Sequence, residues 1–416
     1  MKDSESLKHD LFEKKYSELT PEDIEYCKTL DSLDMKCINL EGLLDKIPFS
    51  SNLSYLTLMD NHLTYLSEKI GNLVNLTHLK IIDNMLTFVP RQIGNLKRLN
   101  VLHIENSGLV SLPDEVRKLQ NLHELSLINN QIVSIPPAVF YLRNLNVLHL
   151  ANNKIAHIPK GVRDLNCCKV FDFSKNQITE LPSQVSELKE LTHLWLGDNC
   201  FSFFPETIYN LQQLSTLGLE GNQISHISKK IAHLQNLTDF RLDDNRFMLI
   251  PREIGQLKKL YHLDISRNRI SKIPDEICGL GDLQYFRMNN NEIKSLPKDI
   301  GKLKKLHSLN ISGNQINSLP KDIGKLKKLH SLDISGNQIN SLPRSFSQLQ
   351  NLEYLKIDSH NIRDYIENHF QDRDIFSEKY DARQIIVKVT VRYGDRCVDL
   401  PTMFGKDFIL ETLELT

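Results

Sequence analysis

A 23-residue stretch of this sequence occurs twice in succession. Residues Lys298–Pro320 read KDIGKLKKLHSLNISGNQINSLP, and Lys321–Pro343 repeat them with one change, from Asn310 to Asp333. A close-packed globular core rarely accepts a second copy of one of its pieces. An array accepts one readily, because each unit contacts only the units beside it. The duplication therefore predicts a repeat protein.

The same unit extends along nearly the whole chain. Steps of 23 residues reach fourteen positions without an insertion, and twelve of them are Asn. They are Asn61, Asn84, Ser107, Asn130, Asn153, Asn176, Asn199, Asn222, Asn245, Asn268, Asn291, Asn314, Asn337 and His360. A degenerate unit around Leu30, Leu33 and Leu40 precedes them. This regularity predicts a solenoid, which grows in one dimension and needs no single large core for its 416 residues.

Each unit has the pattern L-x-x-L-x-L-x-x-N-x-I-x-x-L-P-x-x-I-G-x-L. The L-x-L segment, Leu309 and Ile311 in one copy, alternates with a period of two, which predicts short strands that stack into a parallel sheet. We expect the buried Asn to turn the chain and to hydrogen-bond the backbone of adjacent units. Pro320 ends the extended part, and Ile323 and Leu326 suit a short helical or 3₁₀ return. Because the return is wider than the strand, the stack should bend with the sheet on its concave side.

This pattern resembles the leucine-rich repeat superfamily over residues 30–362. The Leu296-Pro297 and Ile300-Gly301 pairs resemble the intracellular 23-residue class, which includes the Ras-group scaffold proteins and bacterial relatives. The resemblance implies an α/β fold, a curved solenoid of about 14–15 repeats with a concave parallel β-sheet and short convex helices or 3₁₀ turns. It also implies protein binding, mostly on the concave face, without catalysis. Ser107, which breaks the Asn series, predicts weaker local packing.

The ends of the chain are expected to cover the apolar faces of the terminal repeats. In residues 1–29, Thr20-Pro21 suits an N-cap followed by a first helical position, so we predict an N-terminal helical cap. Residues 363–416 are predicted to form a C-terminal α+β cap, with a separate binding module as the alternative. Its expected elements are a helix at Arg363–Phe370 and strands at Gln384–Tyr393, Cys397–Leu400 and Phe408–Leu413.

The strand side chains that flank the inward positions face the concave side. Between residues 193 and 288 these positions concentrate aromatic and charged side chains, whereas the duplicated units present small ones such as Ser308 and Ser331. Trp, Tyr and Arg dominate binding hot spots, and Trp195 is the only Trp in the chain. The candidate partner-binding residues are His193, Trp195, Asp239, Arg241, Asp243, His262, Asp264, Tyr285 and Arg287. The alternative is that Trp195 covers its neighbours and the charges form a solvated ladder.

Two other surfaces are weaker candidates. Val101, Ile128, Val147 and Val170 make part of the concave face apolar and could form a second contact region. The lysines of the outer return, from Lys298 to Lys328, should stack in rows that attract an acidic partner or an anionic surface. A solvated convex face is the more common role for such rows.

Composition restricts the function classes. A net charge of −1 gives no general attraction to nucleic acid. Met1–Asp10 lacks the apolar region of a signal peptide, and no stretch approaches 18 consecutive apolar residues, so we expect no membrane span. Seven scattered cysteines fit a reducing cytoplasm rather than a disulfide framework, and we expect a cytoplasmic protein. Secretion as an effector remains open.

The sequence has no pattern typical of catalysis. Its glycines follow the repeat, and none of its 15 histidines lies at metal-ligand spacing, so we predict no catalytic, cofactor or metal site. Cys397-Val-Asp399 matches a short element of bacterial leucine-rich repeat ubiquitin ligases, but only 17 residues follow it here, and those enzymes carry it in a large helical domain.

We therefore predict a non-enzymatic protein–protein interaction scaffold in intracellular signal transduction. Its concave face would hold a protein partner, with Trp195, Arg241, Tyr285 and Arg287 as anchors. The alternatives are a self-associating structural homodimer and a bacterial effector that acts on host proteins by binding them.

Overall fold

The computed structural model describes residues 30–36, 52–358, 386–393 and 396–403. It divides into two compact units, residues 1–217 and 218–416, and each is described by itself. The predicted N-terminal helical cap in residues 1–29 lies outside the described residues. So do the helix predicted at Arg363–Phe370 and the strand predicted at Phe408–Leu413.

The first unit is a stack of parallel strands, each paired with the next in the chain. Its strands are β1 (Ser32–Lys36), β2 (Tyr55–Met59), β3 (His78–Ile82), β4 (Val101–Glu105), β5 (Glu124–Ser126), β6 (Val147–His149), β7 (Val170–Asp172) and β8 (His193–Trp195), and β9 (Thr216–Gly218) lies at the unit boundary. Its 3₁₀ helices are η2 (Glu68–Asn72), η3 (Arg91–Asn95), η4 (Asp114–Lys118), η5 (Pro137–Tyr141), η6 (Lys160–Asp164), η7 (Ser183–Glu187) and η8 (Glu206–Asn210). The paired residues of β1 to β8 are 23 positions apart, as the repeat predicts.

The second unit continues the same pattern. Its strands are β10 (Asp239–Arg241), β11 (His262–Asp264), β12 (Tyr285–Arg287), β13 (Ser308–Asn310), β14 (Ser331–Asp333), β15 (Tyr354–Asp358), β16 (Ile386–Tyr393) and β17 (Arg396–Met403). Its 3₁₀ helices are η9 (Lys229–His233), η10 (Arg252–Gln256), η11 (Asp275–Gly279), η12 (Ile300–Lys302), η13 (Lys321–Lys325) and η14 (Arg344–Gln348). Strands β10 to β16 pair in parallel, and β17 returns antiparallel to β16. Both last strands fall where the sequence predicts extended segments.

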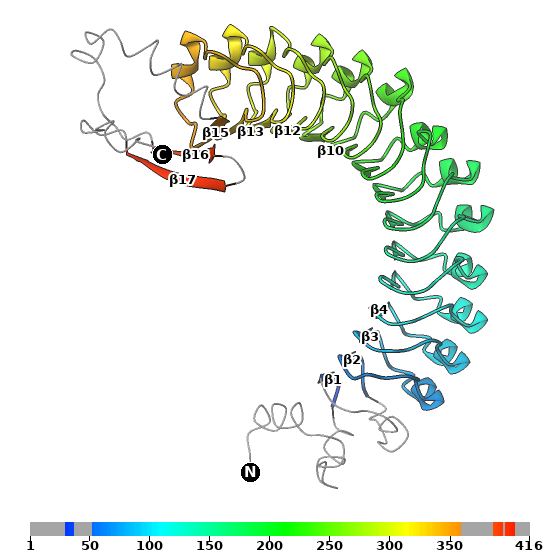
Figure 1. The fold of residues 1–416 in the computed structure, drawn as a ribbon. Helices are drawn as coiled ribbons and strands as arrows, with labels where there is room; N and C mark the ends of the chain where they lie inside the picture. The colour runs from blue at the N-terminus through cyan, green and yellow to red at the C-terminus, as the bar shows by residue number, and fades with distance from the viewer. Residues whose placement is uncertain (1–29, 37–51, 359–385, 394–395, 404–416) are drawn as a thin grey trace. The chain divides into compact units, whose positions relative to one another are not determined.

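The predicted solenoid is confirmed. In each unit the strands line the inner side of a bent stack and the 3₁₀ helices line the outer side (Figure 1). The outer return is a 3₁₀ turn, in which Ile323 N–H donates to the Pro320 carbonyl over 3.0 Å and Leu326 N–H donates to the Ile323 carbonyl over 3.1 Å. Pro320 precedes this turn with φ −65° and ψ 147°, an extended conformation that its ring favours.

The core is a set of apolar columns, one residue of each per repeat. In one duplicated unit Leu306, Leu309, Ile311, Ile316 and Ile323 are all fully buried. Because each column meets the same column of the next repeat, burial is continuous along the stack, and every repeat depends on its neighbours for it.

The predicted Asn ladder is present. Asn291 Nδ2 donates to the Ile265 and Met288 carbonyls over 3.0 and 3.2 Å, and its Oδ1 accepts from Ile270 N–H over 2.9 Å. The side chain therefore satisfies backbone groups of its own turn and of the preceding repeat in a place that water does not reach. Ser107 is too short for this role, and its Oγ bonds only the Glu105 carbonyl, over 3.2 Å.

The residue before each ladder position adopts a left-handed backbone conformation. In thirteen successive repeats φ lies between 49° and 67°, a region that favours Gly, Asn and Asp. Eleven of these positions carry one of those three residue types, and the exceptions are Lys175 and Arg267.

The 3₁₀ turns of neighbouring repeats pack too closely for side chains at certain glycines. A Cβ on Gly324 would lie 2.0 Å from the Ser345 carbonyl oxygen, and one on Gly255 would lie 2.1 Å from the Glu276 carbonyl oxygen. These glycines set the separation of adjacent repeats on the outer side.

Candidate partner-binding site

The nine residues predicted to bind a partner are divided between the units. His193 and Trp195 flank the buried Leu194 on β8 of the first unit, and both are half-buried. The other seven lie on or directly after β10, β11 and β12 of the second unit. Eight of the nine are at least partly accessible, and Asp264 on β11 is buried.

Three of the predicted residues bond to one another. Arg241 donates to both carboxylate oxygens of Asp239, over 3.3 and 3.1 Å, and His262 Nδ1 lies 2.8 Å from the same carboxylate. Burial opposes ionisation of Asp239, but the bonds to His262 and Arg241 outweigh it and hold its pKa below the usual value. Asp239, Arg241 and His262 therefore form a ladder across two strands, and a partner must compete with it to use them.

Aromatic side chains stand beside this ladder. Tyr285 is 38% exposed, and its ring centroid lies 5.2 Å from that of Tyr261 at an angle of 57°. A hydrogen bond between the two hydroxyl groups raises the pKa of Tyr261. Together the two rings offer a partner a stable surface that is both apolar and able to hydrogen-bond.

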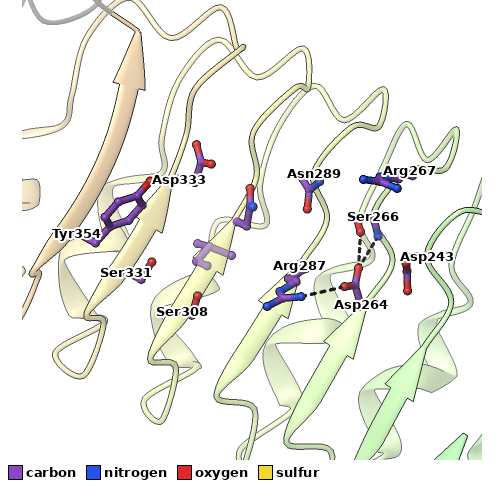
Figure 2. Close-up of a pocket in the computed structure, with 12 residues that line it drawn as sticks. Asp243, Asp264, Ser266, Arg267, Arg287, Asn289, Ser308, Ser331, Asp333 and Tyr354 are labelled. Atoms are coloured by element: carbon purple, nitrogen blue, oxygen red, sulfur yellow. Dashed lines mark hydrogen bonds and ion pairs between the residues drawn. The ribbon is translucent and has the colours of Figure 1, made fainter. Parts of the chain in front are cut away.

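A pocket of about 500 Å³ opens on the strand face next to Arg287 (Figure 2). It crosses six successive repeats, and polar side chains form most of its lining. The lining residues are Asp243, Asp264, Ser266, Arg267, Arg287, Asn289, Ser308, Leu309, Asn310, Ser331, Asp333 and Tyr354. Asp243, Asp264 and Arg287 are among the nine predicted residues, whereas Asp239, Arg241, His262 and Tyr285 lie outside the lining.

Asp264 is held near one end of this pocket, next to Asp243. Its Oδ1 accepts from the N–H and the hydroxyl of Ser266, over 3.0 and 2.5 Å, and Arg287 approaches its Oδ2 at 3.8 Å (Figure 2). The same turn recurs in both duplicated units, where the Ser312 hydroxyl donates to Asn310 Oδ1 and the Ser335 hydroxyl donates to Asp333 Oδ1. The recurring turns fix the acceptor groups along the pocket in similar orientations.

Asp243 is a carboxylic acid of this pocket whose pKa is raised. Burial and the negative charge of Asp264 raise its pKa to about 6, and the more distant Arg241 and Arg267 offset this only in part. No cation lies within 4 Å of Asp243 in the described part of the chain. A partly buried carboxylate in this state is stabilised by any cation that reaches it, and such groups concentrate at functional sites.

Arg267 reaches the pocket from a strained position. Its φ of 51° lies in the left-handed region, where a side chain other than Gly, Asn or Asp costs about 1 kcal/mol. Strain of this kind recurs at functional sites, and here it places a guanidinium group at the pocket edge (Figure 2).

The sequence interpretation missed the residues that create the hollow. Ser308 and Ser331 occupy the register positions between Tyr285 and Tyr354, so two small side chains follow one another between two large ones. A run of small residues in an otherwise bulky column is the signal that could have located the pocket.

Several lysines of the outer rows connect neighbouring repeats. Lys305 bonds Asp282 over 2.7 Å, and Lys304 and Lys327 donate to the Lys325 and Gln348 carbonyls over 3.3 and 2.9 Å, all in adjacent repeats. Lys325 instead bonds Asp322 of its own repeat over 2.8 Å. Among the described residues no cluster of three His, Cys, Asp or Glu side chains could hold a metal ion. No helix in that part of the chain is long and apolar enough to cross a bilayer.

A family model described as a leucine-rich repeat region matches residues 11–148, 137–243, 229–312 and 297–369. The chain belongs to the leucine-rich repeat family. This leucine-rich repeat chain is similar to a solved leucine-rich repeat protein of Leptospira interrogans, with a TM-score of 0.80 and 34% identity over 86% of this chain and 93% of the other. No curated protein matches the sequence.

Two further solved structures share the fold. The plant peptide hormone receptor RGFR1 in complex with RGF2 is 29% identical, with a TM-score of 0.65 over 82% of this chain and 61% of the receptor. An internalin, InlF, from Listeria monocytogenes has a TM-score of 0.67 over 76% of this chain and 93% of its own. At 22% identity this last likeness shows the fold alone.

Proposed function

We propose that this leucine-rich repeat protein is a non-enzymatic scaffold that binds a protein partner on the strand face of its second unit. The observation that carries the proposal is the polar pocket that crosses six repeats beside the exposed Tyr285. In this proposal an extended segment of the partner lies in the pocket, and Tyr285 and Arg287 serve as anchors.

The dimensions of the pocket suit an extended chain. Parallel strands lie about 4.8 Å apart, so six repeats span about 24 Å, the length of about seven extended residues. Amide and hydroxyl groups recur along this path at Asn289, Ser308, Asn310 and Ser331, and Asp333 adds a carboxylate. Such groups can pair with the N–H and C=O groups of a peptide, which need partners once they leave water.

The charge of Asp243 suggests the chemistry of one end of that segment. A Lys or Arg side chain placed there would relieve the repulsion between Asp243 and Asp264 and lower the raised pKa. Binding should then weaken as the pH falls below about 6, where Asp243 becomes neutral.

Comparison with relatives supports peptide recognition in general terms. The plant receptor of the same fold is a peptide hormone receptor and was solved in complex with RGF2. The cytoplasmic setting and the signalling role belong to the proposal, and they rest on the resemblance to the intracellular 23-residue class. The four described free cysteines, Cys167, Cys168, Cys200 and Cys278, agree with a reducing compartment.

Filling the pocket tests the proposal. Ser308→Tyr and Ser331→Tyr place in the hollow a residue that the same column already holds at Tyr285 and Tyr354. The matched control is Ser318→Tyr, at an exposed position that does not line the pocket. Partners captured from source-cell lysate by the wild-type protein should be retained by the control and bind at least about ten-fold more weakly to the filled variants. Equal retention by all three variants would reject this site.

A further inference from the structure

Two histidines of the duplicated units lie against each other. His307 and His330 stand directly before β13 and β14, and their ring centroids are 5.4 Å apart with the ring planes at 8°. The backbone joins the two positions, because His330 N–H donates to the His307 carbonyl over 2.9 Å. The duplication of the 23-residue unit therefore places two imidazole rings side by side. We call these two residues the histidine pair.

A hydrogen bond fixes the tautomer of each ring. His307 Nδ1 lies 2.7 Å from the Lys305 carbonyl oxygen, and His330 Nδ1 lies 2.7 Å from the Lys328 carbonyl oxygen. A carbonyl oxygen only accepts hydrogen bonds, so Nδ1 carries the proton in both neutral rings and Nε2 carries the lone pair. Within the described residues each ring makes this one hydrogen bond, through Nδ1. Both Nε2 atoms are therefore available to a ligand.

Histidines that bind metal ions in proteins are held in the same way. Such a histidine coordinates the metal through one ring nitrogen and donates the other N–H to a backbone carbonyl or a carboxylate, which orients the ring and raises its basicity. We propose that the histidine pair binds a divalent transition metal ion, with His307 Nε2 and His330 Nε2 as its two protein ligands. Water fills the remaining coordination positions, so the site holds its metal reversibly.

The separation of the rings is close to what one shared metal ion requires. Since the rings are nearly parallel and make the same hydrogen bond, their Nε2 atoms are about as far apart as their centroids. A metal bonds imidazole nitrogen at about 2.0–2.1 Å, so two nitrogens that share one ion lie about 3–4 Å apart. The rings must tilt toward each other by on the order of 1–2 Å. Both side chains are half-buried, and small rotations about χ1 and χ2 provide this movement.

The donor atoms and the nearby charges indicate which ion binds. Imidazole nitrogen suits Cu²⁺, Ni²⁺ and Zn²⁺ rather than Mg²⁺ or Ca²⁺, and Cu²⁺ binds such sites most tightly. Lys305 is neutralised by Asp282 at 2.7 Å, and Lys328 is exposed, where solvent screens its charge. Glu353 follows in the same column of the next repeat and adds a negative charge near the pair.

A third histidine provides an internal comparison. His123 occupies the same position of an earlier repeat, and its Nδ1 lies 2.7 Å from the Asn121 carbonyl oxygen. The residues 23 positions before and after it are Asn100 and Asn146, so His123 has the same turn without a second imidazole. It should therefore bind the metal much more weakly than the histidine pair. Spacing along the sequence did not reveal the pair, because only the stacking of repeats makes residues 23 apart into neighbours.

Calorimetric titration of the untagged full-length protein with CuCl₂ tests the proposal. The chain has 15 histidines, so the test compares variants. The wild-type protein should show a site with a dissociation constant in the micromolar range, and His307→Asn and His330→Asn should each weaken it at least about ten-fold. The matched control His123→Asn should leave it unchanged. Asn already occupies this column at Asn100 and Asn146, so the fold accepts the substitution, and circular dichroism verifies it.

A second variant tests whether pairing makes the site. Asn146→His places an imidazole beside His123, because Asn146 N–H donates to the His123 carbonyl over 2.8 Å as His330 N–H does to His307. This variant should gain one Cu²⁺ site of similar affinity. Titrations of the two pair variants that match the wild type would overturn the proposal. An Asn146→His variant without an additional site would overturn the argument that two stacked imidazoles create it.

Discussion

Ser107 interrupts the Asn ladder, and replacing it with Asn should raise the stability of the folded chain. In the adjacent repeat Asn130 Nδ2 donates to the Ile104 carbonyl over 2.7 Å, and its Oδ1 accepts from Leu109 N–H over 3.1 Å. The equivalent groups around Ser107 are the Ile81 carbonyl and Leu86 N–H. Leu86 is fully buried, and its N–H has no acceptor within the described parts of the chain. The substitution Ser107→Asn should supply one.

The expected gain follows from these two groups. Supplying an acceptor to a buried N–H that lacks one stabilises the folded state by about 1–3 kcal/mol, and a second hydrogen bond to the Ile81 carbonyl adds about 1 kcal/mol. Ordering the longer side chain costs about 1 kcal/mol. Ser107→Asn should therefore raise the free energy of unfolding by about 1–3 kcal/mol. The reverse change, Asn130→Ser, removes a partner from two buried groups and should lower it by about 2–4 kcal/mol.

Urea denaturation measures the free energy of unfolding, and hydrogen exchange reports on the amide concerned. The Leu86 amide should exchange faster than the Leu109 amide in the wild-type protein, and Ser107→Asn should slow it. A variant of unchanged or lower stability whose Leu86 amide exchanges as in the wild type would show that the ladder is not limited by this hydrogen bond.

Three further substitutions test separate parts of the account. Asp243→Asn removes a carboxylate whose pKa is raised to about 6. The folded chain holds that proton more tightly than the unfolded chain, so the wild type loses stability as the pH rises from about 4 to 6. In urea titrations the free energy of unfolding of the variant should therefore exceed that of the wild type by about 1 kcal/mol at pH 7 and equal it near pH 4. Arg267→Asn should relieve left-handed strain and raise stability by about 0.5 kcal/mol, while weakening partner capture; lower stability would contradict the strain argument. Gly324→Ala forces a Cβ against the Ser345 carbonyl and should cost about 2–3 kcal/mol in the same assay, whereas a neutral effect would mean that the repeats separate freely.

The fold was predictable because each repeat residue acts locally. Leu309 must point inward, Asn314 must hydrogen-bond the backbone, and Pro320 must end the extended segment. The same requirements recur in each repeat. The glycine at position 324 is explained only by the structure, because the nearest atom to its missing Cβ belongs to the next repeat.

The site was less predictable, because it depends on relations between residues. Arg241 was chosen for its residue type, yet two hydrogen bonds engage it with Asp239. Ser308 and Ser331 were set aside as small, yet their lack of volume leaves room for the pocket between Tyr285 and Tyr354. The role of Trp195, half-buried in the first unit, stays a prediction.

Site-specific photo-crosslinking tests the central claim most directly. A photoreactive amino acid at Ser331 lies in the pocket, and the same amino acid at Ser341 lies at an exposed position outside its lining. If the strand face of the second unit binds the partner, irradiation in source cells should crosslink one protein at Ser331 and not at Ser341. Crosslinking of that protein at Ser341 alone, or equally at both positions, would contradict the proposed function.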